Sequence, residues 1–180
     1  AARVGTPAGG RPGGLEAFAR NFEIRRHIAD GGMGSVYEAR DRGLDRVVAI
    51  KRMCQELRDK PAGLARFLRE ARITAALRHP NIVEIYSVVD TDGEALLVLE
   101  YVDGRTLADM IETKGGLSPG ECLRVVRQAG AALEFAHSRR VIHRDFKPSN
   151  VMLDGNGVVK VMDFGVARVS KQTLSHVGGS

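Results

Sequence analysis

The sequence of 180 residues contains no tryptophan, few other aromatic residues and only two cysteines. No apolar run approaches the roughly 20 residues that a membrane-spanning helix needs, and no secretory signal opens the chain. Cys54 and Cys122 lie far apart and in no metal-ligand spacing, which favours inert thiols in a reducing compartment. These features favour a globular domain of the cytoplasm.

A strong charge of one sign is also lacking. The net charge of +5 is mild, and the 27 lysines and arginines are spread along the chain. Nucleic-acid-binding domains usually gather basic residues on one face and add aromatic side chains or a reading motif. Neither feature is visible, so we expect no nucleic-acid partner.

The first half of the chain alternates short apolar runs with turn residues. Residues 1–21 are rich in Gly, Pro and Ala and are expected to form a flexible lead-in. A helix is predicted from residue 61 to about residue 78, because apolar residues there recur at helical spacing. Five strands are predicted in this half, at residues 22–28, 36–39, 47–51, 82–86 and 95–99.

The second half is predicted to be mainly helical. A short helix is expected at 107–113 and a longer one at 118–138, where Ser118 and Glu121 form a capping-box signature. A hairpin of two short strands follows at 151–161. A strand-rich half joined to a helical half predicts two lobes with a ligand cleft between them. Leu123, Val126, Ala129, Gly130 and Leu133 are expected to give the longer helix an apolar face.

One short run concentrates the polar chemistry: His143-Arg144-Asp145-Phe146-Lys147-Pro148-Ser149-Asn150, followed by Asp163-Phe164-Gly165. A carboxylate can accept a hydroxyl proton, a lysine can contact a phosphate, and Asp and Asn oxygens suit a hard cation such as magnesium. The alternative is a polar loop capped by Asp and Asn side chains, but loops rarely combine this order and spacing by chance. The run predicts a site of phosphoryl transfer.

Two other features are weak when taken alone. Gly31-Gly32-Met33-Gly34 lies between two predicted strands and would let backbone amides approach a phosphate, although such a hairpin is more often only a turn. Lys51 is the last residue of an apolar strand. Taken alone, it is more simply explained as a lysine that extends from a sheet edge into solvent. Glu70 lies on the predicted helix in step with its apolar positions, so we expect a buried ion pair between Glu70 and Lys51.

Taken in chain order, these motifs resemble the protein kinase family, specifically the serine/threonine kinases of bacterial type. The resemblance covers residues 22–180 and includes Val48-Ala49-Ile50-Lys51 and the hinge Glu100-Tyr101-Val102. It implies an α+β, protein-kinase-like fold with a five-stranded antiparallel N-lobe and one main helix at 22–102. An incomplete, mainly helical C-lobe is implied at 103–180.

The resemblance implies ATP and Mg²⁺ as cofactors and the Ser or Thr hydroxyls of proteins as acceptors. By similarity, Asp145 would accept the hydroxyl proton, and Lys147 would approach the γ-phosphate. Lys51, braced by Glu70, would hold the α- and β-phosphates. The implied magnesium ligands are Asn150 and Asp163. The residues implied to surround the nucleotide are Ile28, Ala29, Gly31, Gly32, Gly34, Val36, Ala49, Leu99, Glu100, Val102 and Met152.

Some positions depart from the family pattern. Ala29 stands where the first glycine of the loop belongs, and Thr74 stands where an apolar residue usually packs towards Phe164, so Thr74 is predicted to loosen the active arrangement. We expect the chain to be cut within the activation segment, because it ends before an A-P-E motif. A nucleotide-binding pseudokinase and an inactive interaction fragment therefore remain as alternative functions, and a membrane anchor beyond residue 180 stays open.

Arg144 beside the catalytic aspartate resembles the kinases whose activation segment is switched by phosphorylation. This resemblance implies self-phosphorylation. The implied acceptors are Thr173 and Ser175, with Ser170 and Ser180 as further hydroxyls of the segment.

Overall fold

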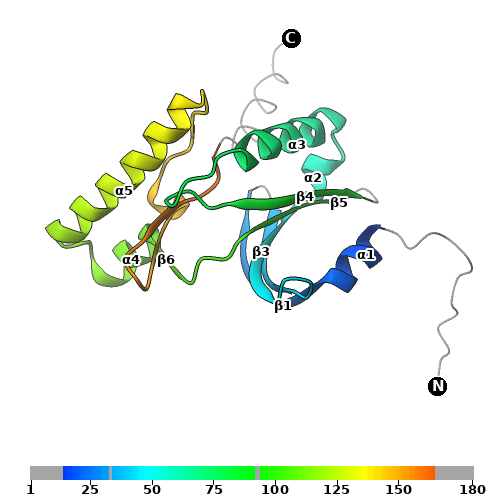
Figure 1. Cartoon of the computed structure of the whole chain (residues 1–180), viewed down its shortest axis with the longest axis horizontal. Helices are drawn as coiled ribbons and strands as arrows, with labels where there is room; N and C mark the ends of the chain where they lie inside the picture. Colours follow the sequence, from blue (N-terminus) through cyan, green and yellow to red (C-terminus); the bar gives the residue numbers. More distant parts are fainter. Residues whose placement is uncertain (1–13, 33, 92–93, 165–180) are drawn as a thin grey trace, which may run out of the picture.

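A computed structural model describes residues 14–32, 34–91 and 94–164, which form a sheet-rich lobe and a second lobe with more helix (Figure 1). The first lobe contains one antiparallel sheet in the order β1-β2-β3-β5-β4. The predicted five-stranded N-lobe is therefore confirmed. Its strands are β1 (Phe22–Gly31), β2 (Gly34–Asp41), β3 (Arg46–Met53), β4 (Ile85–Thr91) and β5 (Glu94–Glu100).

The expected lead-in is wrong for residues 14–21, which form helix α1 (Gly14–Asn21) directly before β1. The Phe18 ring stacks on that of Phe22, with 4.6 Å between the ring centroids, and both pack against a buried cluster that includes Val48. A helix of eight residues is too short to show a clear apolar period in the sequence, so this contact with the sheet decides its structure. Residues 1–13 lie outside the described part of the chain.

Strand β4 begins at Ile85, three residues later than predicted. The preceding residues pair with the other lobe instead: Ile82 forms a parallel bridge with Val161, and the backbone amide of Val83 donates to the Val161 carbonyl. The apolar run at 82–86 is thus divided between two sheets. The spacing of apolar residues along this run does not indicate which of them pair with β5 and which pair with β8.

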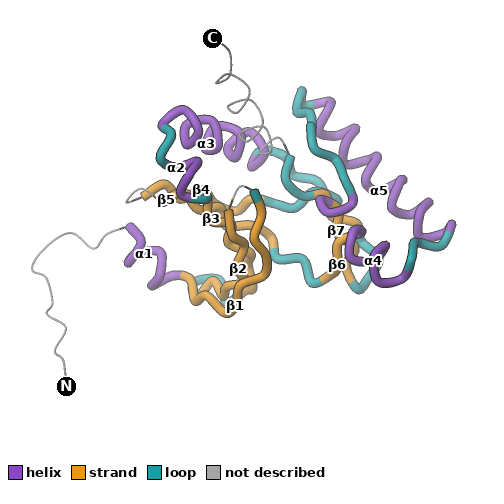
Figure 2. The backbone as a smooth tube through the Cα atoms, turned by 180° about the vertical axis from the view of Figure 1, so that it is seen from behind, coloured by secondary structure: helices purple, strands orange, loops and turns teal. Residues whose placement is uncertain are grey.

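Helix α3 (Pro61–Ala75) follows the short helix α2 (Gln55–Arg58) and packs on one face of the five-stranded sheet (Figures 1 and 2). Phe67 and Ala71 of α3 are fully buried against Met53 of β3 and Leu97 of β5. These positions recur at helical spacing, which is why the sequence predicts this helix correctly. The face also orients Glu70 and Thr74 towards the second lobe.

The second lobe contains a three-stranded sheet and two helices. The sheet has the order β6 (Gly104–Thr106), β7 (Val151–Asp154), β8 (Val159–Val161), and a short 3-10 helix, η1 (Pro148–Asn150), precedes β7. Helix α4 (Leu107–Lys114) follows β6. Helix α5 (Pro119–Ser138) begins at the predicted capping box, in which the Glu121 amide donates to Ser118 Oγ and the Ser118 amide donates to the Glu121 carboxylate.

The apolar residues of α5 are divided between an exposed and a buried set. Leu123 and Val126 are 60% and 68% exposed. The buried residues are Val125, Ala129, Ala132 and Ala136. They follow the i, i+4, i+7, i+11 spacing of one helix face, and small side chains dominate it, so β8 approaches the helix closely.

No helix within the described residues is long and apolar enough to cross a bilayer. The two lobes meet at the hinge after β5 and along β8, where the Ile82 bridge forms. The residues named above as candidate site residues, Glu70 excepted, line a cavity at this junction.

Gly34, the first residue of β2, lies so close to the backbone of β3 that only glycine fits there. Its φ is +138°, and a Cβ atom there would lie 1.8 Å from the Arg52 carbonyl oxygen of β3. We expect Gly34→Ala to lower the free energy of unfolding by about 3 kcal/mol, because the backbone of β3 must shift. The matched control is Gly32→Ala, where the new Cβ meets no atom within 4 Å. Chemical denaturation of both variants measures the difference, and an equal stability of the two would contradict this explanation.

Candidate active site

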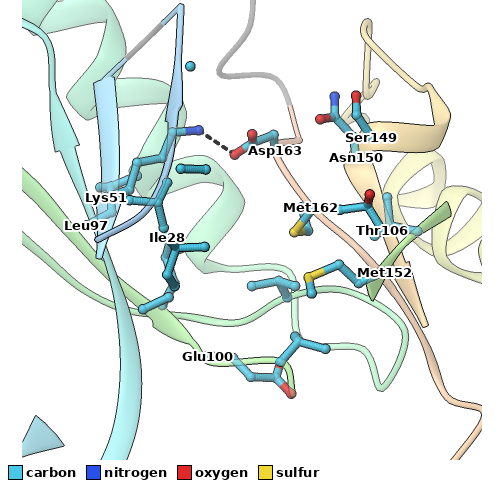
Figure 3. A pocket seen from close by; sticks show the side chains of 18 of the residues that line it. Ile28, Lys51, Leu97, Glu100, Thr106, Ser149, Asn150, Met152, Met162 and Asp163 are labelled. Carbon is cyan, nitrogen blue, oxygen red and sulfur yellow. Dashed lines mark hydrogen bonds and ion pairs between the residues drawn. The ribbon is translucent and has the colours of Figure 1, made fainter. Parts of the chain in front are cut away.

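A cavity of about 730 Å³ lies between the two lobes (Figure 3). This volume falls within the range of about 300–1,000 Å³ typical of small-molecule sites. Strands β1, β2 and β3 and the hinge line one side, and β7 and the run from Asp145 to Asn150 line the other. Every candidate site residue of the sequence analysis lines this cavity except Glu70.

Several lining residues were not predicted as site residues, among them Arg26, Leu97, Thr106 and Met162. Leu97 lies two positions before Leu99 on β5, so both side chains point to the same face of the sheet, and strand alternation was the signal for it. Met162 directly precedes Asp163. Arg26 donates to the Tyr101 hydroxyl across 3.0 Å, a contact between β1 and the hinge that local sequence does not reveal.

The glycine-rich turn combines close packing with open space. Ala29 stands where the family pattern has the first glycine of the loop. It pairs with Val36 across β1 and β2, so its small side chain fits the hairpin. Gly34 is packed tightly against β3, whereas Gly32 faces open space. Among the described residues other than its chain neighbours, no atom comes within 4 Å of a Cβ placed at Gly32. Met33 lies outside the described residues.

Lys51 lies on β3, between β2 and β5, and is 7% exposed. It is thus a buried lysine of a central strand and does not extend from a sheet edge. Its Nζ atom lies 2.6 Å from Oδ1 of Asp163, as the dashed line in Figure 3 marks. The backbone of Asp163 has a φ of +58°, a left-handed conformation that few residues other than glycine adopt. The ion pair joins the two lobes across the cavity.

The predicted ion pair between Lys51 and Glu70 is not formed in this structure. Glu70 Oε1 accepts from Nε of Arg66 at 3.2 Å, and Arg144 Nη1 lies 3.9 Å from the same oxygen. Arg66 is four residues before Glu70 on α3, where an opposite charge is a helix neighbour. In this structure Asp163 supplies Lys51 with another carboxylate. The other oxygen, Oε2, is buried and has no hydrogen-bond partner among the described residues.

Asp145 is surrounded by groups that stabilise its charged form. Its Oδ2 atom lies 2.8 Å from Lys147 Nζ and accepts from Asn150 Nδ2 at 3.2 Å. The Asn150 amide also donates to the Asp145 carbonyl, across 2.8 Å. The hydrogen bond from Lys147 is the main cause that holds the pKa of Asp145 below its ordinary value. Asp145 is therefore a carboxylate at neutral pH, as a proton acceptor must be.

His143 connects Asp145 to the segment that carries Asp163. The Asp145 amide donates to His143 Nδ1 at 3.3 Å, so Nε2 carries the proton and donates to the Met162 carbonyl at 2.7 Å. The His143 ring also lies 4.6 Å from the ring of Phe164. His143 is only 3% exposed, and this burial lowers its pKa. The neutral ring therefore holds the two segments together.

Comparisons with known proteins agree with this geometry. Residues 22–179 match the protein kinase domain family. The serine/threonine-protein kinase PknB of Mycobacterium leprae is 41% identical over 158 residues, which are 86% of this chain and 25% of that protein. PrkC of Bacillus subtilis is 42% identical over 156 residues, 86% of this chain and 24% of that protein. The crystal structure of the PknI kinase domain of Mycobacterium tuberculosis superimposes with a TM-score of 0.73 at 30% identity, covering 82% of this chain and 59% of that one.

The fold and the family match place this chain in the protein kinase family. Within the family, the chain is similar to bacterial proteins named as serine/threonine-protein kinases. It spans about a quarter of the length of these curated relatives. The predicted α+β kinase fold, with an incomplete C-lobe, is confirmed.

The buried His143 gives the stability of the domain a defined pH dependence. Its pKa in the folded protein lies below the ordinary value of about 6.5, so the unfolded chain binds its proton more readily. The contribution of His143 is present above about pH 6.5 and is lost as the pH falls through the folded-state pKa. We expect the free energy of unfolding of the kinase domain to fall between pH 7 and pH 5.

In His143→Asn this pH dependence should be weaker, as denaturant titrations at several pH values would measure. His79, whose pKa burial also lowers, provides a matched variant in His79→Asn. That variant should keep the part of the slope that comes from His143. An unchanged slope in His143→Asn would show that His143 does not cause it.

Proposed function

We propose that the protein is an ATP-dependent serine/threonine protein kinase and that residues 22–180 carry its nucleotide site and chemical centre. In this proposal, residues 22–102 form the N-lobe with the hinge and residues 103–180 form part of the C-lobe. The observation that carries the proposal is the convergence of Lys51, Asp145, Asn150 and Asp163 on one cavity. Lys51 is more than 90 positions away from the other three in the chain, so only the fold brings it to them.

The cavity fits a nucleotide. Apolar side chains of Val36, Ala49 and Met152 line it next to the hinge, where an adenine ring would pack between the lobes. Backbone groups of Glu100 and Val102 would meet the edge of that ring, and Leu99 would limit the depth of its site. The open space beside Gly32 leaves room for phosphates near backbone amides.

The polar end of the cavity fits the phosphates with magnesium. Asn150 and Asp163 supply a carboxamide and a carboxylate, the oxygen ligands that Mg²⁺ prefers, and Mg²⁺ typically keeps phosphate oxygens and waters as its other ligands. When bound, magnesium would neutralise charge on the phosphates. Lys51 is already held at the same place by Asp163 and would contact the α- and β-phosphates.

Asp145 would orient the acceptor hydroxyl and take its proton. Its low pKa keeps it ionised, and Lys147 beside it adds a positive charge where the γ-phosphate would lie. The protein then contributes mainly position and electrostatic stabilisation to the transfer. A lysine two positions after the aspartate, together with the names of the similar bacterial proteins, supports serine and threonine side chains of proteins as acceptors.

Glu70 is proposed to brace Lys51 in the working enzyme. Support comes from its buried Oε2 atom, which has no hydrogen-bond partner among the described residues. Leaving a buried carboxylate oxygen without a donor is unfavourable, so a second arrangement with Lys51 as donor would relieve this cost. In that arrangement Glu70 exchanges Arg66 and Arg144 for Lys51.

Self-phosphorylation is proposed as the event that draws Arg144 away from Glu70. The Arg144 side chain is 45% exposed and its contact with Glu70 is long, at 3.9 Å, so it can bind a phosphate. The proposed acceptors, Thr173 and Ser175, lie outside the described residues, as do Ser170 and Ser180. We also propose that the reaction takes place in the cytoplasm, because it consumes ATP.

The kinase assignment is tested by transfer of radiolabelled phosphate from ATP to a generic protein substrate by the full-length protein. We expect Asp145→Asn to lower the rate by about 100-fold or more, since general-base groups typically contribute that much. Lys51→Met and Glu70→Gln should also lower the rate, because both disturb the position of the phosphates. Mapping the label on the protein itself tests the proposed acceptors, and label only outside 170–180 would contradict them.

The matched control is Asp90→Asn, an exposed carboxylate on β4 at the end opposite to the cavity-lining Ile85. It should transfer label at the rate of the unmodified protein. Equal incorporation in Asp145→Asn, Lys51→Met and the unmodified protein would contradict the kinase assignment. A different result, in which the unmodified protein binds ATP but transfers no label, would favour a nucleotide-binding scaffold.

A further inference from the structure

Thr74 is a buried hydroxyl residue that none of the roles above uses. It lies in the last turn of α3, four residues after Glu70, and is 6% exposed. Its Oγ1 atom donates to the Phe164 carbonyl across 3.0 Å, and the two residues are 90 positions apart in the chain. The sequence predicted that a polar residue here loosens the active arrangement, and in the structure its hydroxyl has a partner in the other lobe.

This hydrogen bond completes the support of Asp163. The carbonyl of Met162, the residue before Asp163, accepts from His143. The carbonyl of Phe164, the residue after it, accepts from Thr74. Asp163 itself has a left-handed backbone, which costs about 1 kcal/mol or more and persists only where neighbouring contacts fix it. A side chain thus fixes the peptide group that precedes Asp163, and another fixes the carbonyl of the residue that follows it.

The two side chains act from different lobes. His143 belongs to the second lobe, and the Phe164 ring is buried in the core of that lobe with Val161 and Leu77. Thr74 belongs to α3, which packs on the sheet of the first lobe. A threonine in a helix commonly bonds back to the carbonyl four residues before it, but this hydroxyl is directed across the lobe junction instead.

We propose that Thr74 is a positioning residue: its hydroxyl fixes the Phe164 carbonyl and thereby orients the Asp163 carboxylate towards the metal-nucleotide. The inference rests on the proposed function, because it assigns the use of Asp163 to Mg²⁺ and ATP. It goes beyond that function in naming a residue of α3 that sets the orientation. The hydroxyl carries the effect, whereas the volume of the side chain does not.

The test compares Thr74→Val, which keeps the shape and removes the donor, with Thr74→Ser, which keeps the donor. Calorimetric titration of the full-length protein with ADP, with and without Mg²⁺, reports the orientation of Asp163 without requiring turnover. Thr74→Val should weaken Mg²⁺-dependent ADP binding by about fivefold, since a buried carbonyl loses its donor, and leave metal-free binding unchanged. Thr74→Ser should bind as the unmodified protein does.

Phosphate transfer by the same variants gives a second readout. We expect kcat to fall by about fivefold in Thr74→Val, while KM for a protein substrate stays unchanged, because the acceptor site is not disturbed. The control is Thr113→Val on α4, whose hydroxyl also accepts and donates hydrogen bonds but lies on an exposed face outside the cavity. It should change neither ADP binding nor transfer.

Equal effects of Thr74→Val and Thr74→Ser would overturn the proposal, since volume and not the hydroxyl would then matter. Unchanged Mg²⁺-dependent binding in Thr74→Val would overturn it as well. If the unmodified protein binds Mg²⁺ with ADP but transfers no phosphate, the proposed kinase function fails. The titrations with Thr74→Val then still decide the role of Thr74.

Discussion

The ion pair between Lys51 and Asp163 is the contact on which the site depends. It joins a central strand of the first lobe to the segment after β8 of the second lobe, at 2.6 Å. Lys51 is buried, so its charge requires a partner close by. The fold provides this partner from 112 positions away in the chain. Lys51 and Asp163 belong to different lobes. Their ion pair therefore also fixes the distance between the two walls of the cavity in which the nucleotide would lie.

The remaining polar contacts fix the two ends of that pair and the proposed base. His143 and Thr74 hold the carbonyls of the residues before and after Asp163, and Lys147 with Asn150 holds the Asp145 carboxylate. Charges of both signs are therefore placed before any substrate arrives, which is how a site lowers a barrier by position and electrostatics. Glu70 is the exception, since one of its oxygens is buried without a donor among the described residues.

Much of the fold and site was predictable because the signals are local. Apolar spacing gave α3, alternation and turn residues gave the sheet, and the order of motifs gave the residues that line the cavity. The failures concern choices between distant partners. Helix α1 depends on the contact of Phe18 with the sheet, residues 82 and 83 pair with the other lobe, and Lys51 pairs with Asp163 and not with Glu70. A pattern along the chain does not rank such partners.

The central claim is that the cavity between the lobes binds ATP together with Mg²⁺ and that Asp163 is the residue that makes this binding metal-dependent. The most direct measurement is the affinity of the full-length protein for ATP with and without Mg²⁺, compared between the unmodified protein and Asp163→Asn. The account predicts that Mg²⁺ tightens ATP binding in the unmodified protein and that this tightening is lost in Asp163→Asn. Equal tightening by Mg²⁺ in both proteins would contradict it.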